Sequence, residues 1–215
     1  MKTSRILLLP AVLWVGACST AREGAREHIR PAYDKATGKL TELAYDADRN
    51  GRIETWTEMN GNKAVRSRID RNEDGRIDRW EYFDADGNLV KVGFSRKDTG
   101  TSDAWAFADR DGTVSRVEIS SAGDETRIDR REYYDAREAG SGTARQLARA
   151  DEDTDRDGRA DRWETYEQGA LRTVAFDENG DGVADRRLTY EGAVLVWIES
   201  RPDTAGRFAS RVRAN

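Results

Sequence analysis

Cysteine, histidine and proline are almost missing from this chain. Its 215 residues include one cysteine, one histidine and three prolines. A single cysteine has no intramolecular disulfide partner, so disulfides do not hold the fold together. His28 alone provides neither a histidine base nor a histidine-rich zinc site beside the repeats described below. The motif Gly-x-Ser-x-Gly, a phosphate-cradling loop and a dinucleotide fingerprint are also absent. The sequence therefore predicts that the protein is not an enzyme, and a hydrolase using carboxylate catalysis is the least favoured alternative.

Apolar sequence is scarce as well. Apolar residues make up 37% of the chain, charged residues 36%, and the mean hydropathy is −0.87. Such a composition would border on disorder if the chain lacked tryptophan and tyrosine, because burial of apolar surface would not repay the ordering of the chain. The net charge of −5 argues against a nucleic-acid partner. We therefore expect a source of stability other than a large core.

The N-terminus has the layout of an export signal. Lys2 and Arg5 precede the apolar stretch Ile6–Val15, which is too short to span a bilayer. The segment Val15-Gly16-Ala17-Cys18 resembles the lipobox of bacterial lipoproteins, and this resemblance implies a diacylglyceryl thioether on Cys18 after removal of residues 1–17. The same resemblance implies the outer membrane, because Ser19 rather than an aspartate follows Cys18, and residues 18–32 would be a tether. The alternative is an ordinary secretory signal with an unmodified cysteine.

Four acidic loops share the pattern Asp-x-(Asp/Asn)-x-(Asp/Asn)-Gly-x-(Ile/Ala)-(Asp/Glu), at 46–54, 70–78, 153–161 and 177–185. Side-chain oxygens at positions 1, 3, 5 and 9 and a backbone carbonyl at position 7 suit calcium, which takes six to eight oxygen ligands. The sequence predicts a Ca²⁺ ion in each loop. The predicted ligands are Asp46, Asp48, Asn50 and Glu54; Asp70, Asn72, Asp74, Arg76 and Asp78; Asp153, Asp155, Asp157, Arg159 and Asp161; and Asp177, Asn179, Asp181, Val183 and Asp185.

Two of these loops match the EF-hand pattern in full. Glu81 and Glu164 stand at position 12, where that resemblance implies a bidentate ligand, whereas Thr57 and Leu188 stand there in the other two. Position 9 is acidic in all four loops, which resembles the loops of thrombospondin type 3 and dockerin-like repeats and favours ligation through position 9. EF-hand ligation through Glu81 and Glu164 remains the alternative.

The segments between loops predict strands. Each is interrupted by a turn such as Asp84–Asn88 and leaves arms of about six residues, which is a usual strand length but fewer than two helical turns. The sequence therefore predicts a mainly β fold, an elongated array of antiparallel β-hairpins joined by calcium loops over residues 33–215. Helix–loop–helix pairs of the EF-hand kind are the alternative. Degenerate loops without metal are expected near 95 and 121, and an insertion near 136–150 is expected to loop out.

Tryptophan recurs two residues beyond position 9 of the loops, at Trp56, Trp80, Trp105 and Trp163. A periodic tryptophan is typical of packing between repeats.

Taken together, these patterns predict a lipid-anchored, calcium-binding protein of the bacterial envelope that acts as a structural or interaction module. Its predicted partners are the membrane, through the anchor, and an envelope protein or glycan. A calcium sensor or buffer is the alternative function.

Overall fold

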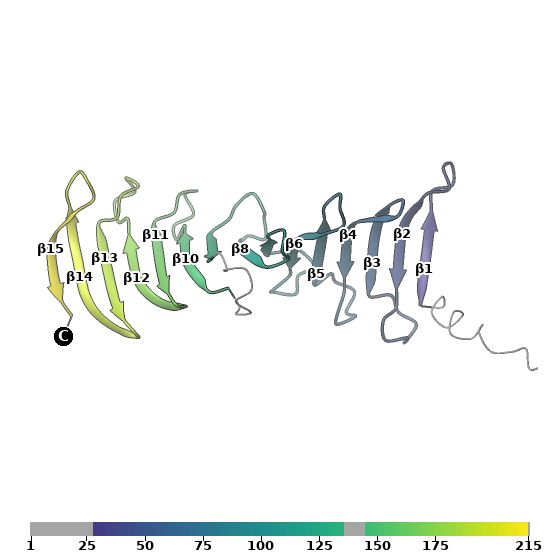
Figure 1. The fold of residues 1–215 in the computed structure, drawn as a ribbon, viewed down its shortest axis with the longest axis horizontal. Helices are drawn as coiled ribbons and strands as arrows, with labels where there is room; N and C mark the ends of the chain where they lie inside the picture. Colours follow the sequence, from purple (N-terminus) through teal and green to yellow (C-terminus); the bar gives the residue numbers. More distant parts are fainter. Residues whose placement is uncertain (1–27, 136–144, 215) are drawn as a thin grey trace, which may run out of the picture.

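The computed structural model describes residues 28–135 and 145–214, and the regular secondary structure of these residues consists entirely of β-strands. Fifteen strands pair in sequence order into one antiparallel meander, drawn in Figure 1 as a single layer. They are β1 (Ile29–Tyr33), β2 (Leu40–Tyr45), β3 (Thr55–Asn60), β4 (Lys63–Ile69), β5 (Arg79–Phe83), β6 (Leu89–Phe94), β7 (Ala104–Ala108), β8 (Val114–Ile119), β9 (Arg130–Tyr134), β10 (Leu147–Glu152), β11 (Arg162–Glu167), β12 (Ala170–Phe176), β13 (Arg186–Glu191), β14 (Val194–Pro202) and β15 (Phe208–Arg213).

This architecture confirms the predicted hairpin array. The helix–loop–helix alternative is wrong, because the described ranges contain no helix, and hence none long and apolar enough to cross a membrane. The physical reason is arm length: each arm has room for one strand but for less than two turns of helix.

Different connections lie at the two ends of the strands. Because neighbouring strands run in opposite directions, every connection from an even to an odd strand lies at the same ends, along a side of the sheet that we call the loop edge. The opposite turn edge carries tight turns such as 84–88, where the Asp84 N–H donates to the Asn88 carbonyl at 2.9 Å. In Figure 1 the loop edge lies at the bottom near β2 and at the top near β14, so the ribbon turns over along its length, as accumulated strand twist requires.

The two faces of the sheet also differ. Directly paired residues point to the same face, and one such row crosses all fifteen strands. It contains four tryptophans, and the fifth described tryptophan, Trp197, lies two residues along β14 from this row, on the same face. We call this side the tryptophan face and the other the aliphatic face. The row is Arg30, Ala44, Trp56, Arg68, Trp80, Gly93, Trp105, Glu118, Arg131, Asp151, Trp163, Ala175, Arg187, Glu199 and Arg211.

The best-packed part of the sheet is its centre, on strands β6 and β7. Trp105 is 2% exposed, whereas Trp56, Trp80 and Trp163 are only half-buried. Gly93 makes the burial of Trp105 feasible: a Cβ on Gly93 would lie 3.4 Å from Cδ1 of the Trp105 ring and 3.2 Å from Ser102 Cβ. Tryptophan packing of the expected kind is therefore complete at one of the four positions.

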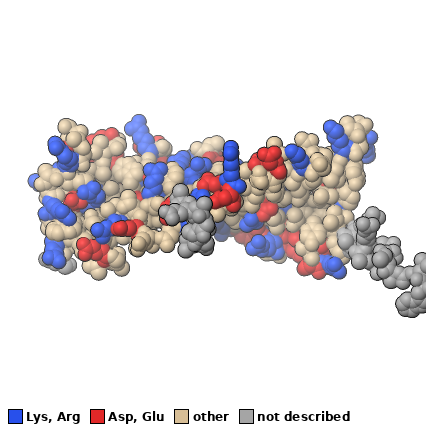
Figure 2. Space-filling model, viewed as in Figure 1, with Lys and Arg blue, Asp and Glu red and all other residues tan. Residues whose placement is uncertain are grey.

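Several predicted boundaries shift. Strand β1 begins at Ile29, inside the predicted tether, and β10 begins at Leu147, inside the stretch expected to loop out. Residues 136–144 lie outside the described residues, as do the signal 1–17 and Cys18. Figure 2 shows a long, narrow body with basic and acidic side chains along its whole length.

Candidate metal centres on the loop edge

Six loops lie in succession along the loop edge, at 46–54, 70–78, 95–103, 120–129, 153–161 and 177–185. The same backbone hydrogen bond joins each loop to the next, from the N–H of its first residue to the carbonyl of the last residue of the preceding loop. In Asp70 N–H to Glu54 carbonyl it measures 2.8 Å, and in Asp177 N–H to Asp161 carbonyl 2.9 Å. Each loop is therefore hydrogen-bonded to its neighbours, and the six loops form a continuous series.

The acidic side chains shape each loop by accepting backbone hydrogen bonds. In the loop 153–161, Asp153 accepts from the N–H groups of Asp157 at 3.1 Å and Gly158 at 2.9 Å, and Asp161 accepts from Thr154 at 3.1 Å. The fourth residue, Arg156, has φ 67° and Gly158 has φ 96°, the left-handed conformation that closes so tight a turn. These bonds draw the carboxylates towards the inside of the loop.

One of these loops brings three carboxylates together. Oxygens of Asp153, Asp155 and Asp161 all lie within 4.8 Å of one another, in the part of the chain that the structure describes. This group corresponds to predicted positions 1, 3 and 9, and it could hold a metal ion. The other acidic loops have asparagine at position 3 or 5, and its amide oxygen also turns inward: Asn72 Oδ1 accepts from the Asp74 N–H at 3.1 Å.

In the acidic loops, two buried carboxylates have an oxygen with no hydrogen-bond partner. Asp70 is 5% exposed and uses Oδ2 to accept from the Gly75 N–H at 2.9 Å, while its Oδ1 is buried and unpaired. Glu54 is 8% exposed and uses Oε1 for the Ala47 N–H, while its Oε2 is likewise unpaired. A buried anionic oxygen without a donor is costly, and a cation in the loop would satisfy it. This is the strongest structural sign of a ligand in the first two loops.

The degenerate loops keep the same shape with other groups. Ser95 and Ser120 replace the first aspartate, and their hydroxyls accept from Thr99 N–H at 3.0 Å and Asp124 N–H at 3.1 Å. Asp103, at position 9 of the loop 95–103, has a buried unpaired oxygen too, but the Arg96 guanidinium lies 3.2 Å from its other oxygen. In this degenerate loop an arginine therefore supplies positive charge next to the position-9 carboxylate.

The surroundings of two aspartates in these loops shift their pKa values in opposite directions. Burial alone would raise the pKa of Asp177, but backbone N–H groups of Gly182, Gly180 and Asn179 outweigh it and lower the pKa, so this carboxylate stays ionised. In Asp98, burial and the nearby charges of Asp74 and Asp78 raise the pKa. Asp98 belongs to the degenerate loop 95–103, so neighbouring loops are close enough to interact electrostatically.

The glutamates at position 12 lie on the strands that follow the loops, on the aliphatic face. Glu81 receives a hydrogen bond from Arg79 at 2.8 Å. Glu164 is 5% exposed and accepts from Arg130 and from Tyr166, both at 2.7 Å. Both carboxylates are thus engaged by side chains of the sheet, which leaves position 9 as the acidic position that closes each loop.

Sequence reasoning missed the ionic network around Glu164. Arg130 also contacts Glu132 at 2.9 Å and Glu152 at 3.1 Å, and Arg162 contacts Glu152 at 3.0 Å. Burial alone would lower the pKa of Arg130, but the hydrogen bonds to Glu164 and Glu132 raise it above its ordinary value. Arginine at position 10 and glutamate at position 12 share a face on one strand, and this was the available signal.

Comparisons with known proteins add little. No protein-family model matches the chain, and no curated protein is significantly similar. Among solved structures, the chain is similar to TarM at 16% identity and TM-score 0.37, covering 45% of this chain and 18% of TarM. It is similar to a mutant form of S. aureus TarM at 15% and 0.37, covering 46% and 19%, and to the GtfA/B complex at 16% and 0.33, covering 57% and 20%. The matched part is about a fifth of those chains, and a likeness at this level does not extend to function.

Proposed function

We propose that this protein is a lipid-anchored, calcium-binding protein of the bacterial envelope whose sheet serves as a non-enzymatic structural or interaction module. Cys18 would carry the anchor, and the four acidic loops would each bind one Ca²⁺ ion. The observation that carries the proposal is the unpaired, buried Oδ1 of Asp70, supported by the carboxylate group of Asp153, Asp155 and Asp161. Both place anionic oxygen where a hard divalent cation would be a favourable partner.

The architecture supports a structural role for calcium. A sheet normally buries one face against another layer, but this meander forms a single layer, and its fully buried apolar side chains are few. Ions in the loops would fix the connections between strands and so replace part of the missing core. At ~1 mM calcium and ~0.1 mM affinity, each site adds about 1.4 kcal/mol to the free energy of unfolding.

Calcium titration by calorimetry, combined with thermal unfolding in excess chelator, tests this function. We expect about four sites and a large fall in melting temperature on chelation. Fewer than two sites at millimolar calcium, or an unchanged melting temperature, would refute the calcium-dependent scaffold. A protein that stays folded without calcium but changes shape would instead be a sensor. The anchor is tested separately by Cys18→Ala, which should release the protein from the membrane fraction.

A further inference from the structure

Charge is divided unequally between the two faces of the sheet. On the tryptophan face a second row runs two residues from the first, and the two rows together hold ten basic and five acidic side chains. The two corresponding rows of the aliphatic face hold four of each. A chain with a net charge of −5 therefore presents a cationic surface on the same side as all its described tryptophans.

The second row alternates aromatic and cationic residues across six strands, β5 to β10. Each cation lies over a ring: Lys91 over Tyr82 at 4.4 Å, Arg116 over Phe107 at 4.1 Å and Arg149 over Tyr133 at 4.0 Å from the ring centre. Stacking holds the cations in place before any ligand arrives, together with ion pairs from Lys91 to Glu125 at 2.5 Å and from Arg116 to Glu118 at 3.0 Å. The row is Tyr82, Lys91, Phe107, Arg116, Tyr133 and Arg149.

The spacing of these cations is set by the sheet. Successive cations of the row stand two strands apart, which is about 9.6 Å. That distance is close to the length of one disaccharide unit in an extended polysaccharide. A chain with one carboxylate per disaccharide would therefore meet one cation per repeat.

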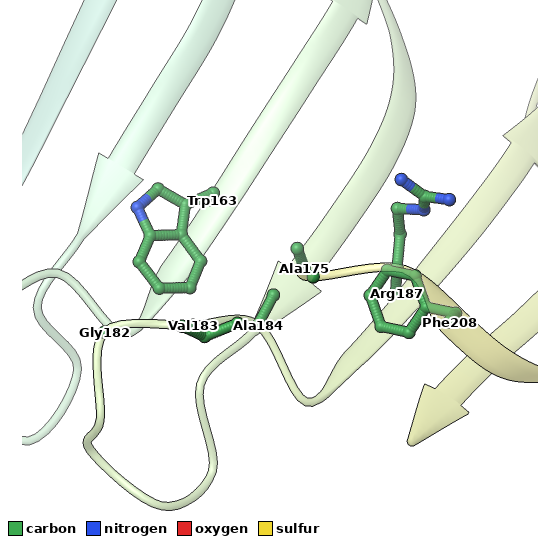
Figure 3. A pocket seen from close by; sticks show the side chains of 8 residues that line it. Trp163, Ala175, Gly182, Val183, Ala184, Arg187 and Phe208 are labelled. Carbon is green, nitrogen blue, oxygen red and sulfur yellow. The ribbon is translucent and has the colours of Figure 1, made fainter. Parts of the chain in front are cut away.

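The tryptophan face also contains a groove of about 390 Å³ near its C-terminal end. Three consecutive members of the tryptophan row line it: Trp163, Ala175 and Arg187. Figure 3 shows Trp163 and Phe208 on either side of Ala175, with the chain at Gly182–Ala184 below. The small Ala175 leaves a slot between two aromatic rings, and Trp163 is half-buried, so part of its ring remains accessible. Such a slot suits a sugar ring, which offers an apolar face to an indole and polar groups to arginine.

We infer that the tryptophan face binds an acidic polysaccharide, laid across the strands, with one sugar ring seated against Trp163. This inference names the partner class of the proposed interaction module and rests on that function. Arg187 is bound to Glu199 at 2.7 Å, and the Glu199 side chain, which is 12% exposed, also contacts Arg211 at 3.9 Å. Glu199 therefore keeps one arginine partner when the half-exposed Arg187 turns to a ligand carboxylate. A glycan is favoured over a nucleic acid because the cations of the second row stand about 9.6 Å apart, whereas a nucleic-acid strand carries one charge every ~3.4 Å.

The test measures binding to three probes by calorimetry: a hyaluronan oligosaccharide, which has one carboxylate per disaccharide, a neutral chito-oligosaccharide of the same length, and oligothymidylate. We expect hyaluronan to bind, the neutral glycan to bind at least tenfold more weakly, and the affinity for hyaluronan to fall with added salt. No binding of hyaluronan, equal binding of the neutral glycan, or tighter binding of oligothymidylate would overturn the proposal.

Two neighbouring arginines provide a matched pair of variants. Arg187 and Arg186 are consecutive on β13, point to opposite faces, and each has a glutamate and a phenylalanine as partners. Arg187→Gln should weaken hyaluronan binding about tenfold, the equivalent of one charged hydrogen bond, and Arg186→Gln should leave it unchanged. Equal losses in both variants would exclude the tryptophan face as the binding surface.

The proposed function and this inference fail separately. None of the varied residues is a predicted calcium ligand, and folding is checked by circular dichroism in the same samples. A folded protein that binds calcium but not hyaluronan refutes only the inference. A protein that stays folded and binds hyaluronan in the absence of calcium refutes only the calcium scaffold.

Discussion

The central strands β6 and β7 and the strands beside the acidic loops reach the same fold by different means. In the centre, Trp105 and Ala104 are buried, and the loop 95–103 is closed by a serine and an arginine. On either side the tryptophans are half-buried, and the acidic loops have an aspartate at position 1 and acidic or amide side chains at positions 3 and 5, where the loop 95–103 has Ser95, Lys97 and Thr99. The difference indicates that a strand connection can be held by apolar packing in one repeat, and under the proposed function by an ion in another, because each would fix the loop against its neighbours.

Removal of calcium is expected to produce the largest effect and to separate the two regions. Four sites at the affinities assumed above contribute roughly 5–6 kcal/mol, comparable to the net stability of a typical domain. Hydrogen exchange in excess chelator should show early loss of protection around 46–78 and 153–185, with β6 and β7 protected longest. Uniform loss along the chain would show that the centre has no stability of its own.

Trp105→Ala attacks the central region directly. Removing a fully buried tryptophan leaves a cavity next to Gly93 and should lower the free energy of unfolding by about 3–5 kcal/mol. Urea denaturation at saturating calcium measures this loss. Trp163→Ala is the matched control at the same repeat position; since Trp163 is half-buried, it should lose less than half as much. Equal losses would contradict the distinction between the regions.

Glu164→Gln tests the ionic network of the aliphatic face and should cost about 2 kcal/mol, because Arg130 loses a buried charged partner. Burial alone would raise the pKa of Glu164, but hydrogen bonds from Arg130 and Tyr166 lower it. Stability from this carboxylate is therefore complete above its unfolded pKa and is lost as pH falls through the lower folded pKa. Denaturation followed from neutral to acidic pH should show a smaller decline in the variant, with calcium stoichiometry unchanged.

Asp161→Ala, in the same repeat as Glu164, should have the smallest effect on stability but a clear one on metal. It removes position 9 of the loop 153–161 and should lower the calcium count by about one ion and the free energy of unfolding by about 1.4 kcal/mol at millimolar calcium. Asp86→Ala, on the turn edge, serves as a control without loss of calcium. If Glu164→Gln releases an ion and Asp161→Ala does not, ligation follows the EF-hand pattern after all.

Much of the fold was present in the sequence because it is local. Arms of six residues between glycine-rich turns admit only strands, and the fixed positions of Asp153, Asp155 and Asp161 in a nine-residue loop bring them together in any arrangement of repeats. The register of the aspartates thus specifies a candidate site before any tertiary contact forms.

Only the tertiary structure decided how the repeats are arranged relative to one another. Pairing in sequence order places all loops on one edge, aligns the tryptophans and arginines of distant strands into rows, and leaves one face cationic. Strand pairing also brings Arg130 to Glu164, thirty-four positions later in the chain. Glu164 therefore pairs with a side chain of the sheet rather than with the loop 153–161 that precedes it. These outcomes depend on which strand lies beside which, and cross-strand register is a property of the assembled sheet that no single repeat contains.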